Sequence, residues 1–260
     1  MQQDSPDSTG FTPRADPPPA GATREATVVL GASVAAWALL TWIAVDMGHP
    51  LVQLTMPGVP EWSVLNVLAV FVMWAVMMAA MMLPSALPMI VAFVRLSERA
   101  GEPARARVFV AAYLLVWAGF SAVATALQWA LQAVDWVDPM IVSTSPLLSG
   151  ALLVIAGIYQ FTPLKKICLD TCRTPVGFLM GEWRTGVAGA FSTGLRHGLF
   201  CVGCCWAVTA LLFVGGVMNL PWIAALSIVV AIEKMAPRGD RIALVLGVAL
   251  IVAGVVSWWR

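Results

Sequence analysis

Long apolar segments recur along this chain, and they restrict its fold more than any other feature of the sequence. The first, Ala26 to Val45, has no charged side chain in twenty residues. A helix needs about 20 apolar residues to cross the hydrocarbon core of a bilayer. Only 11% of all residues are charged and 60% are hydrophobic, whereas soluble domains have about 25% charged residues. The sequence therefore predicts an all-α fold, a polytopic transmembrane helix bundle.

We expect about seven spans within a single transmembrane domain, residues 26–260. After the first, they cover residues 62–94, 108–134, 146–161, 198–217, 222–235 and 242–258. Pro84 and Pro88 should kink the long second span, because proline removes a backbone donor. Residues 1–25 contain five prolines among polar residues, so we expect a disordered tail. The first span begins after this tail and is long enough to remain as an anchor rather than act as a cleaved signal.

The distribution of basic residues predicts the orientation of the bundle. With seven spans and a cytoplasmic N-terminus, fourteen of the fifteen lysines and arginines fall in cytoplasmic segments, and Arg260 is the exception. Residues 162–197 then form a cytoplasmic loop that contains Cys168 and Cys172. The net charge of +1 excludes electrostatic capture of nucleic acid as the main activity.

The segment Arg196 to Trp206 holds the densest group of potential metal ligands. Cys201 follows His197 by four residues, and Cys204 and Cys205 follow Cys201 by three and four. In a helix, these four side chains lean toward one face. Thiolate and imidazole are preferred ligands of Cu(I) and Zn(II). One such cysteine alone would suggest packing, since cysteine behaves as a small hydrophobe, but the cluster indicates chemistry.

The remaining cysteines give a weaker signal. Cys168 and Cys172 are one helical turn apart and could chelate one ion together. In the predicted orientation all five thiols face a reducing compartment, which disfavours structural disulfides. The pair Cys201 and Cys204 also has the Cys-x-x-Cys spacing of thiol oxidoreductases. No histidine follows it, which disfavours covalent haem attachment.

Two further features add candidate ligands. Met77 and Met81 belong to a methionine-rich stretch at helical spacing, and thioether sulfur binds Cu(I). Methionine is also a flexible filler between helices, so packing is the alternative for this stretch. Glu233 lies at the end of the sixth predicted span, where a carboxylate is costly unless it is paired. It is either a functional group or the partner of a nearby lysine or arginine.

Several short blocks together resemble a family of bacterial integral membrane proteins that are catalogued as predicted metal binders with a domain of unknown function. The resemblance runs from about residue 30 to about residue 240, and Cys201 to Trp206 is its most specific part. The other blocks are Met73 to Pro84, Tyr159 to Lys165 with Cys168 and Cys172, Gly216 to Asn219, and Glu233-Lys234. The resemblance implies a multi-pass protein of the bacterial inner membrane that binds a metal ion.

The leading hypothesis is a membrane protein that binds copper or zinc on a Cys/His cluster near the cytoplasmic face, for handling, transfer or transport. Two alternatives stay open: a thiol redox protein that uses Cys201, Cys204 and Cys205, and a structural or assembly subunit without metal. The chain lacks P-loop, dinucleotide-binding and hydrolase motifs, so we expect no nucleotide partner and do not favour an enzyme. The expected partners are the lipid bilayer and a protein that delivers or accepts the metal; a homo-oligomer stays open.

Overall fold

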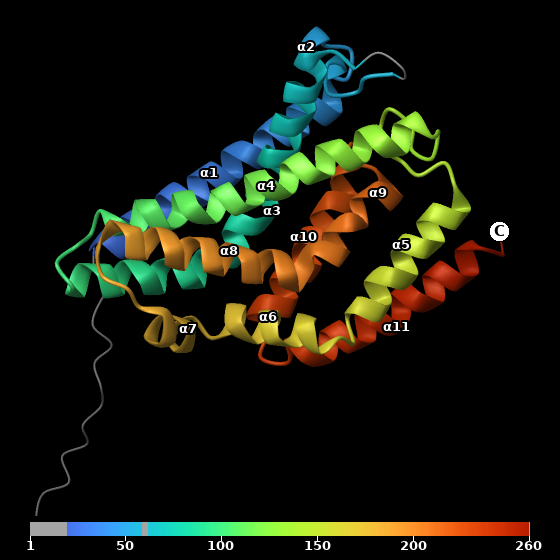
Figure 1. Cartoon of the computed structure of the whole chain (residues 1–260). Coiled ribbons are helices and arrows are strands. Elements are labelled where there is room, and N and C mark those ends of the chain that lie inside the picture. Colours follow the sequence, from blue (N-terminus) through green and yellow to red (C-terminus); the bar gives the residue numbers. More distant parts are fainter. Residues whose placement is uncertain (1–19, 59–61, 260) are drawn as a thin grey trace, which may run out of the picture.

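The computed structural model describes residues 20–58 and 62–259, and within these ranges it contains helices and turns but no strand. Figure 1 shows the helices in chain order. They are α1 (Ala20–Val45), α2 (Pro50–Gln53), α3 (Val64–Arg99), α4 (Arg105–Ala133), α5 (Pro146–Tyr159), α6 (Pro163–Arg173), α7 (Pro175–Glu182), α8 (Gly186–Ala210), α9 (Leu212–Gly215), α10 (Leu220–Met235) and α11 (Gly239–Ser257). The predicted all-α fold is confirmed.

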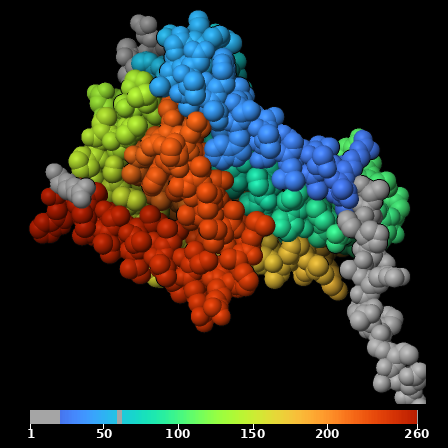
Figure 2. Space-filling view, turned by 180° about the vertical axis from the view of Figure 1, so that it is seen from behind, coloured from blue at the N-terminus to red at the C-terminus, as the bar shows by residue number. Residues whose placement is uncertain are grey.

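The helices form two packed groups that α10 joins. One group contains α1, α3, α4 and α8, and the other is the crossed pair of α5 and α11 (Figure 1). Helix α10 packs against α3, α8 and α11. Seen from behind in Figure 2, the orange C-terminal segment lies between the blue N-terminal helix and the red helix α11.

Glycines allow the helices within each group to approach closely. A Cβ atom at Gly194 of α8 would lie 2.4 Å from the carbonyl oxygen of Phe109 in α4. A Cβ atom at Gly157 of α5 would lie 2.7 Å from the carbonyl oxygen of Gly247 in α11. Small residues at such contacts are typical of helices that pack in a membrane, where close van der Waals contact replaces the hydrophobic effect.

Within the described residues, five helices are long and apolar enough to cross a membrane: α1, α3, α4, α8 extended by α9, and α11. A sixth span results if α5 and α6, which meet at a bend of 66°, are counted as one broken span. Their outward faces are apolar; Val245 of α11, for example, is 71% exposed. In water such a surface would be unfavourable, whereas lipid tails accommodate it. The length and apolar surface of these helices are consistent with a membrane protein.

The seven predicted spans differ from these helices in two places. The predicted sixth span corresponds to α10, whose 16 residues extend for about 24 Å, short of the hydrocarbon core. The predicted fourth span corresponds to α5, with 14 residues before the bend. By length and apolarity the described residues provide five or six spans, so a count of seven and a cytoplasmic N-terminus stay predictions.

The helix bounds differ from the predicted segment bounds at three places. The first helix begins at Ala20, so the end of the predicted 1–25 tail is helical, while residues 1–19 lie outside the described residues. Helix α3 contains Pro84 and Pro88 and continues to Arg99, five residues past the predicted end of the second span, and a kink at these prolines stays a prediction. The predicted loop at 162–197 instead folds into α6, α7 and the first half of α8. A polar composition there indicated a position outside lipid but did not exclude helices.

Candidate metal centre

Helix α8 places three thiols in the interior of the protein. Cys201, Cys204 and Cys205 are each 1% exposed. The thiols of Cys204 and Cys205 both donate to the carbonyl oxygen of Cys201, at 3.1 Å and 3.0 Å. Cys201 precedes them by three and four residues on the same helix, so its side chain lies on the same face. The helical spacing in the sequence predicted that these side chains share a face, and the structure brings them together on it.

Helix α6 adds a fourth thiol. The Sγ atom of Cys172 lies 4.0 Å from the Sγ atom of Cys204. Metal–thiolate bonds are about 2.3 Å long, so two sulfur atoms up to about 4.6 Å apart can share one ion. Helix α6 reaches α8 because Gly203 has no side chain: a Cβ atom there would lie 2.7 Å from the Sγ atom of Cys168. Cys168 therefore supports the contact between α6 and α8, one turn before Cys172.

Helix α3 contributes a thioether to the same place. The Sδ atom of Met82 lies 3.9 Å from the Sγ atom of Cys205. Met77 and Met81, the candidates from the sequence, are buried on α3 as well. The sulfur in contact with a thiol is nevertheless that of Met82, since Met81 is rotated by about 100° along the helix from it. We refer to Cys172, Cys201, Cys204, Cys205 and Met82 as the sulfur cluster.

Lys234 is one of two residues in contact with Cys201 that sequence reasoning missed; the other is Tyr113. Its Nζ atom lies 3.0 Å from the Sγ atom of Cys201, 3.2 Å from the Oγ atom of Ser85 and 4.0 Å from the Sδ atom of Met82. The side chain is buried, 6% exposed. The position of a lysine in an otherwise apolar helix could have indicated a functional role. The sequence Glu233-Lys234 was equally consistent with an ion pair at the membrane interface.

Tyr113 of α4 completes the surroundings of Cys201. Its hydroxyl oxygen lies 3.2 Å from the Cys201 Sγ atom and donates to the carbonyl oxygen of Met82, at 3.3 Å. Cys201 is thus contacted by an ammonium group and a phenol in addition to its sulfur neighbours. The ammonium group can stabilise negative charge on this sulfur atom, and the phenol can do so when its one proton turns from the Met82 carbonyl toward Cys201.

Glu233 forms a buried ion pair rather than a contact with the sulfur cluster. Its Oε2 atom accepts a hydrogen bond of 2.7 Å from the Nζ atom of Lys165, and these side chains are 2% and 1% exposed. Of the two expectations for Glu233, the structure therefore shows the ion pair, and its partner is a lysine from α6. The Oε1 atom of Glu233 has no hydrogen-bond partner among the described residues.

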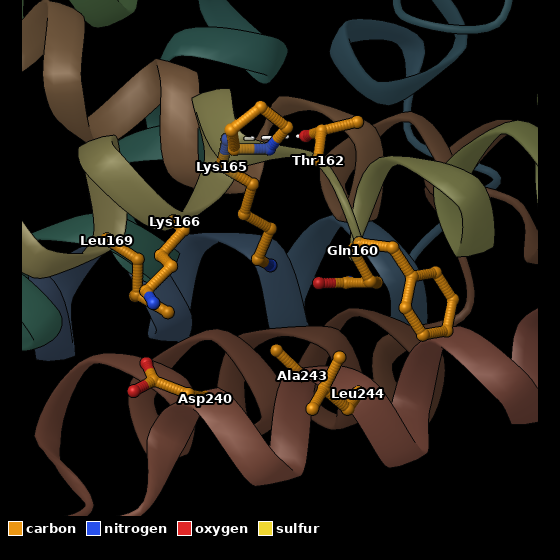
Figure 3. A pocket seen from close by; sticks show the side chains of 10 residues that line it. Gln160, Thr162, Lys165, Lys166, Leu169, Asp240, Ala243 and Leu244 are labelled. Atoms are coloured by element: carbon orange, nitrogen blue, oxygen red, sulfur yellow. Dashed lines mark hydrogen bonds between the residues drawn. The ribbon is translucent and has the colours of Figure 1, made fainter.

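A cavity of about 370 Å³ lies on the other side of Lys165. It is formed where the bend between α5 and α6 meets α11, and Figure 3 shows Gln160, Lys165, Lys166 and Asp240 around it. The amide group of Gln160 is buried and has no hydrogen-bond partner in the part of the chain that the structure describes. Lys165 thus lines the cavity and also forms the buried ion pair with Glu233, the residue directly before Lys234 in the chain.

His197 lies one turn before Cys201, within a group of aromatic rings. Its ring centroid is 5.4 Å from that of Tyr113 and 5.9 Å from those of Phe109 and Phe178. It is 2% exposed, and neither of its ring nitrogens has a hydrogen-bond partner in residues 20–58 and 62–259. The described contacts of the histidine are thus with aromatic rings, two of them stacked on it, rather than with hydrogen-bonding groups.

Within the described residues, no group of three or more His, Cys, Asp or Glu side chains has the arrangement of a formed metal site. The sulfur atoms instead make pairwise contacts of 4.0 Å and 3.9 Å, and the ammonium group of Lys234 lies among them. The donors fit a soft ion by their chemistry, since thiolate and thioether sulfur select Cu(I).

Comparison with known proteins supplies a family. A family model described as "PpoB2: Copper chaperone" matches residues 71–257, which include every residue of the sulfur cluster. No curated protein and no solved structure matches the chain.

Proposed function

Because the chain belongs to the PpoB2 copper chaperone family, we propose that it binds copper as Cu(I) in the sulfur cluster and passes the ion to a protein partner. The observation that carries this proposal is the distance of 4.0 Å between the Sγ atoms of Cys172 and Cys204, which come from different helices. Two thiolates at this separation can hold one ion between them. Zinc is the second ion that such donors accept.

Burial also supports a role in carrying copper. Cu(I) is held best by soft donors away from water, and the cysteines of α8 are almost fully enclosed. Each thiol in the cluster is free of disulfide bonds, so each is available as a ligand. In the orientation that we expect from the charge distribution, the basic segments next to α6 and α8 are cytoplasmic, which supports a position of the cluster near that face. Copper would then be received from, or delivered to, the cytoplasmic side.

Metal content tests the proposal. The protein purified in detergent after expression with copper should retain close to one Cu(I) per chain. Replacing Cys201, Cys204 and Cys205 together by serine should remove it, because serine keeps the size but lacks the soft donor. Cys168→Ser is the matched control: it changes a thiol of α6 that contacts Gly203 rather than another sulfur. Equal copper in all three proteins would contradict the proposal.

The same contact favours one alternative, a thiol redox protein. Thiols 4.0 Å apart can form a disulfide after a small shift, since Sγ atoms in a disulfide are about 2.05 Å apart. This function predicts reversible, redox-dependent protection of Cys172 and Cys204 from alkylation, and no retained metal. A structural subunit, the other alternative, predicts that serine replacements change neither metal content nor thiol reactivity.

A further inference from the structure

Lys234 supplies the only charge next to the sulfur cluster that is not already paired in the described part of the chain. Lys165 and Glu233 neutralise each other at 2.7 Å. Arg173, which follows Cys172 in the chain, is paired with Asp240 at 2.7 Å. Within residues 20–58 and 62–259, Lys234 has no carboxylate within ion-pairing distance. The cluster thus has one fixed positive charge beside it, within an apolar helix bundle.

A charge in such surroundings must be compensated, because the low dielectric makes an unbalanced ion expensive. Two thiolates that bind one Cu⁺ carry one negative charge in total, and the ammonium group of Lys234 balances it. Two thiolates with Zn²⁺ are neutral, so Lys234 would remain uncompensated. Four thiolates, the set that zinc prefers, would leave two negative charges with Zn²⁺, one more than Lys234 provides.

We propose that Lys234 makes the sulfur cluster selective for a monovalent soft ion, Cu(I) or Ag(I), over a divalent one, by acting as the permanent counter-charge of a two-thiolate complex. The geometry supports this role, since the Nζ atom lies 3.0 Å from Cys201 Sγ and is held in place by Ser85 Oγ at 3.2 Å. An ammonium group cannot ligate a metal, so Lys234 acts through the field it creates. The inference rests on the proposed function and names the class of ion.

The test compares affinities for Cu(I) and Ag(I) with those for Zn(II) and Cd(II), by competition with chromogenic chelators, in the full-length protein in detergent. Lys234→Leu removes the charge and adds no sulfur donor to the cluster. We expect the preference for monovalent over divalent ions to fall by about 10- to 100-fold, the range typical when an outer-shell partner is lost. Lys234→Arg should keep the preference. Lys166→Leu, which removes an exposed lysine from α6, is the matched control and should change nothing.

A second variant guards against misfolding of Lys234→Leu. Ser85→Asp leaves Lys234 in place and adds a carboxylate that compensates its ammonium group, so this variant should also bind divalent ions relatively better than the wild type does. Equal losses of affinity for all four ions in Lys234→Leu, or an unchanged preference in both variants, would overturn the inference while the proposed function stands. A wild-type protein that binds none of the four ions would overturn both.

Discussion

Lys234 of α10 and Cys201 of α8 meet in the interior of the protein, with 3.0 Å between the Nζ and Sγ atoms, although they are 33 residues apart in the chain. An amine next to a thiol is unusual at a position that the sequence reads as membrane-buried, since a charge there is costly without a partner. The contact links the end of the short helix α10 to the centre of the cysteine-rich face. A change in the charge of the Cys201 thiol therefore alters the electrostatic energy of the buried ammonium group of Lys234.

Cys172→Ser should weaken Cu(I) binding at least about tenfold, because a lost ligand costs no less than a lost outer-shell partner. Cys168→Ser, one turn away on α6, should leave the affinity within a small factor of the wild-type value. Chelator competition on the two purified variants measures the difference. A larger loss in Cys168→Ser than in Cys172→Ser would show that α6 presents a different thiol to α8.

Met82→Leu should weaken Cu(I) binding by less than about tenfold, since a neutral thioether attracts the ion less than a thiolate. Leucine has a similar volume, so the fold should tolerate it. Met77→Leu provides the comparison on the same helix, and we expect it to bind copper as the wild type does. Identical affinities in both variants would mean that Met82 only packs against Cys205.

Bound Cu(I) or Ag(I) should protect Cys172 from alkylation, because Cys172 is the partly exposed thiol of the sulfur cluster. In the metal-free protein, mild oxidation should join Cys172 to Cys204, because their Sγ atoms lie 4.0 Å apart. Mass spectrometry after maleimide labelling detects both results. If Ag(I) leaves the labelling rate of Cys172 unchanged, the ion is not held at this thiol.

Glu233→Gln should destabilise the protein by about 3–5 kcal/mol, because it leaves the buried ammonium group of Lys165 without its counter-charge. Replacing both partners by methionine should recover most of this loss, as hydrophobic residues avoid the desolvation of two ions. Denaturation in detergent, followed by circular dichroism, gives both values. A single variant as stable as the wild type would show that the pair is solvated.

Reporter insertions test the orientation. A fluorescent protein inserted at the exposed turn around Gly101 should fluoresce, since the basic segment there is expected to be cytoplasmic. Alkaline phosphatase inserted near Met140, at the opposite end of α4, should be active because it is exported. The reverse pattern at both positions would invert the bundle and place the cluster near the outer face.

The sequence predicted the grouping of the cysteines within α8, but not which residues of other helices contact them. Helical spacing was sufficient to put Cys201, Cys204 and Cys205 on one face, because contacts within a helix repeat every three or four residues. It gave no reason to choose Met82 over Met77 or Met81, since all three lie at helical spacing from other methionines. That choice depends on how α3 is rotated against α8. Cys172 was found through its spacing from Cys168, but its contact with Cys204 could not be inferred from spacing.

Apolarity and charge patterns along the chain determined, without any structure, that this protein is a helical bundle suited to a membrane and that its thiols are concentrated in α6 and α8. These properties are local, because they depend on side-chain chemistry and on helical repeats of a few residues. Only the tertiary structure decided that Lys234, Cys201 and Cys172 lie together. Their contacts join three helices, and the packing angles and rotations that create them depend on the whole bundle, including the absence of a side chain at Gly203.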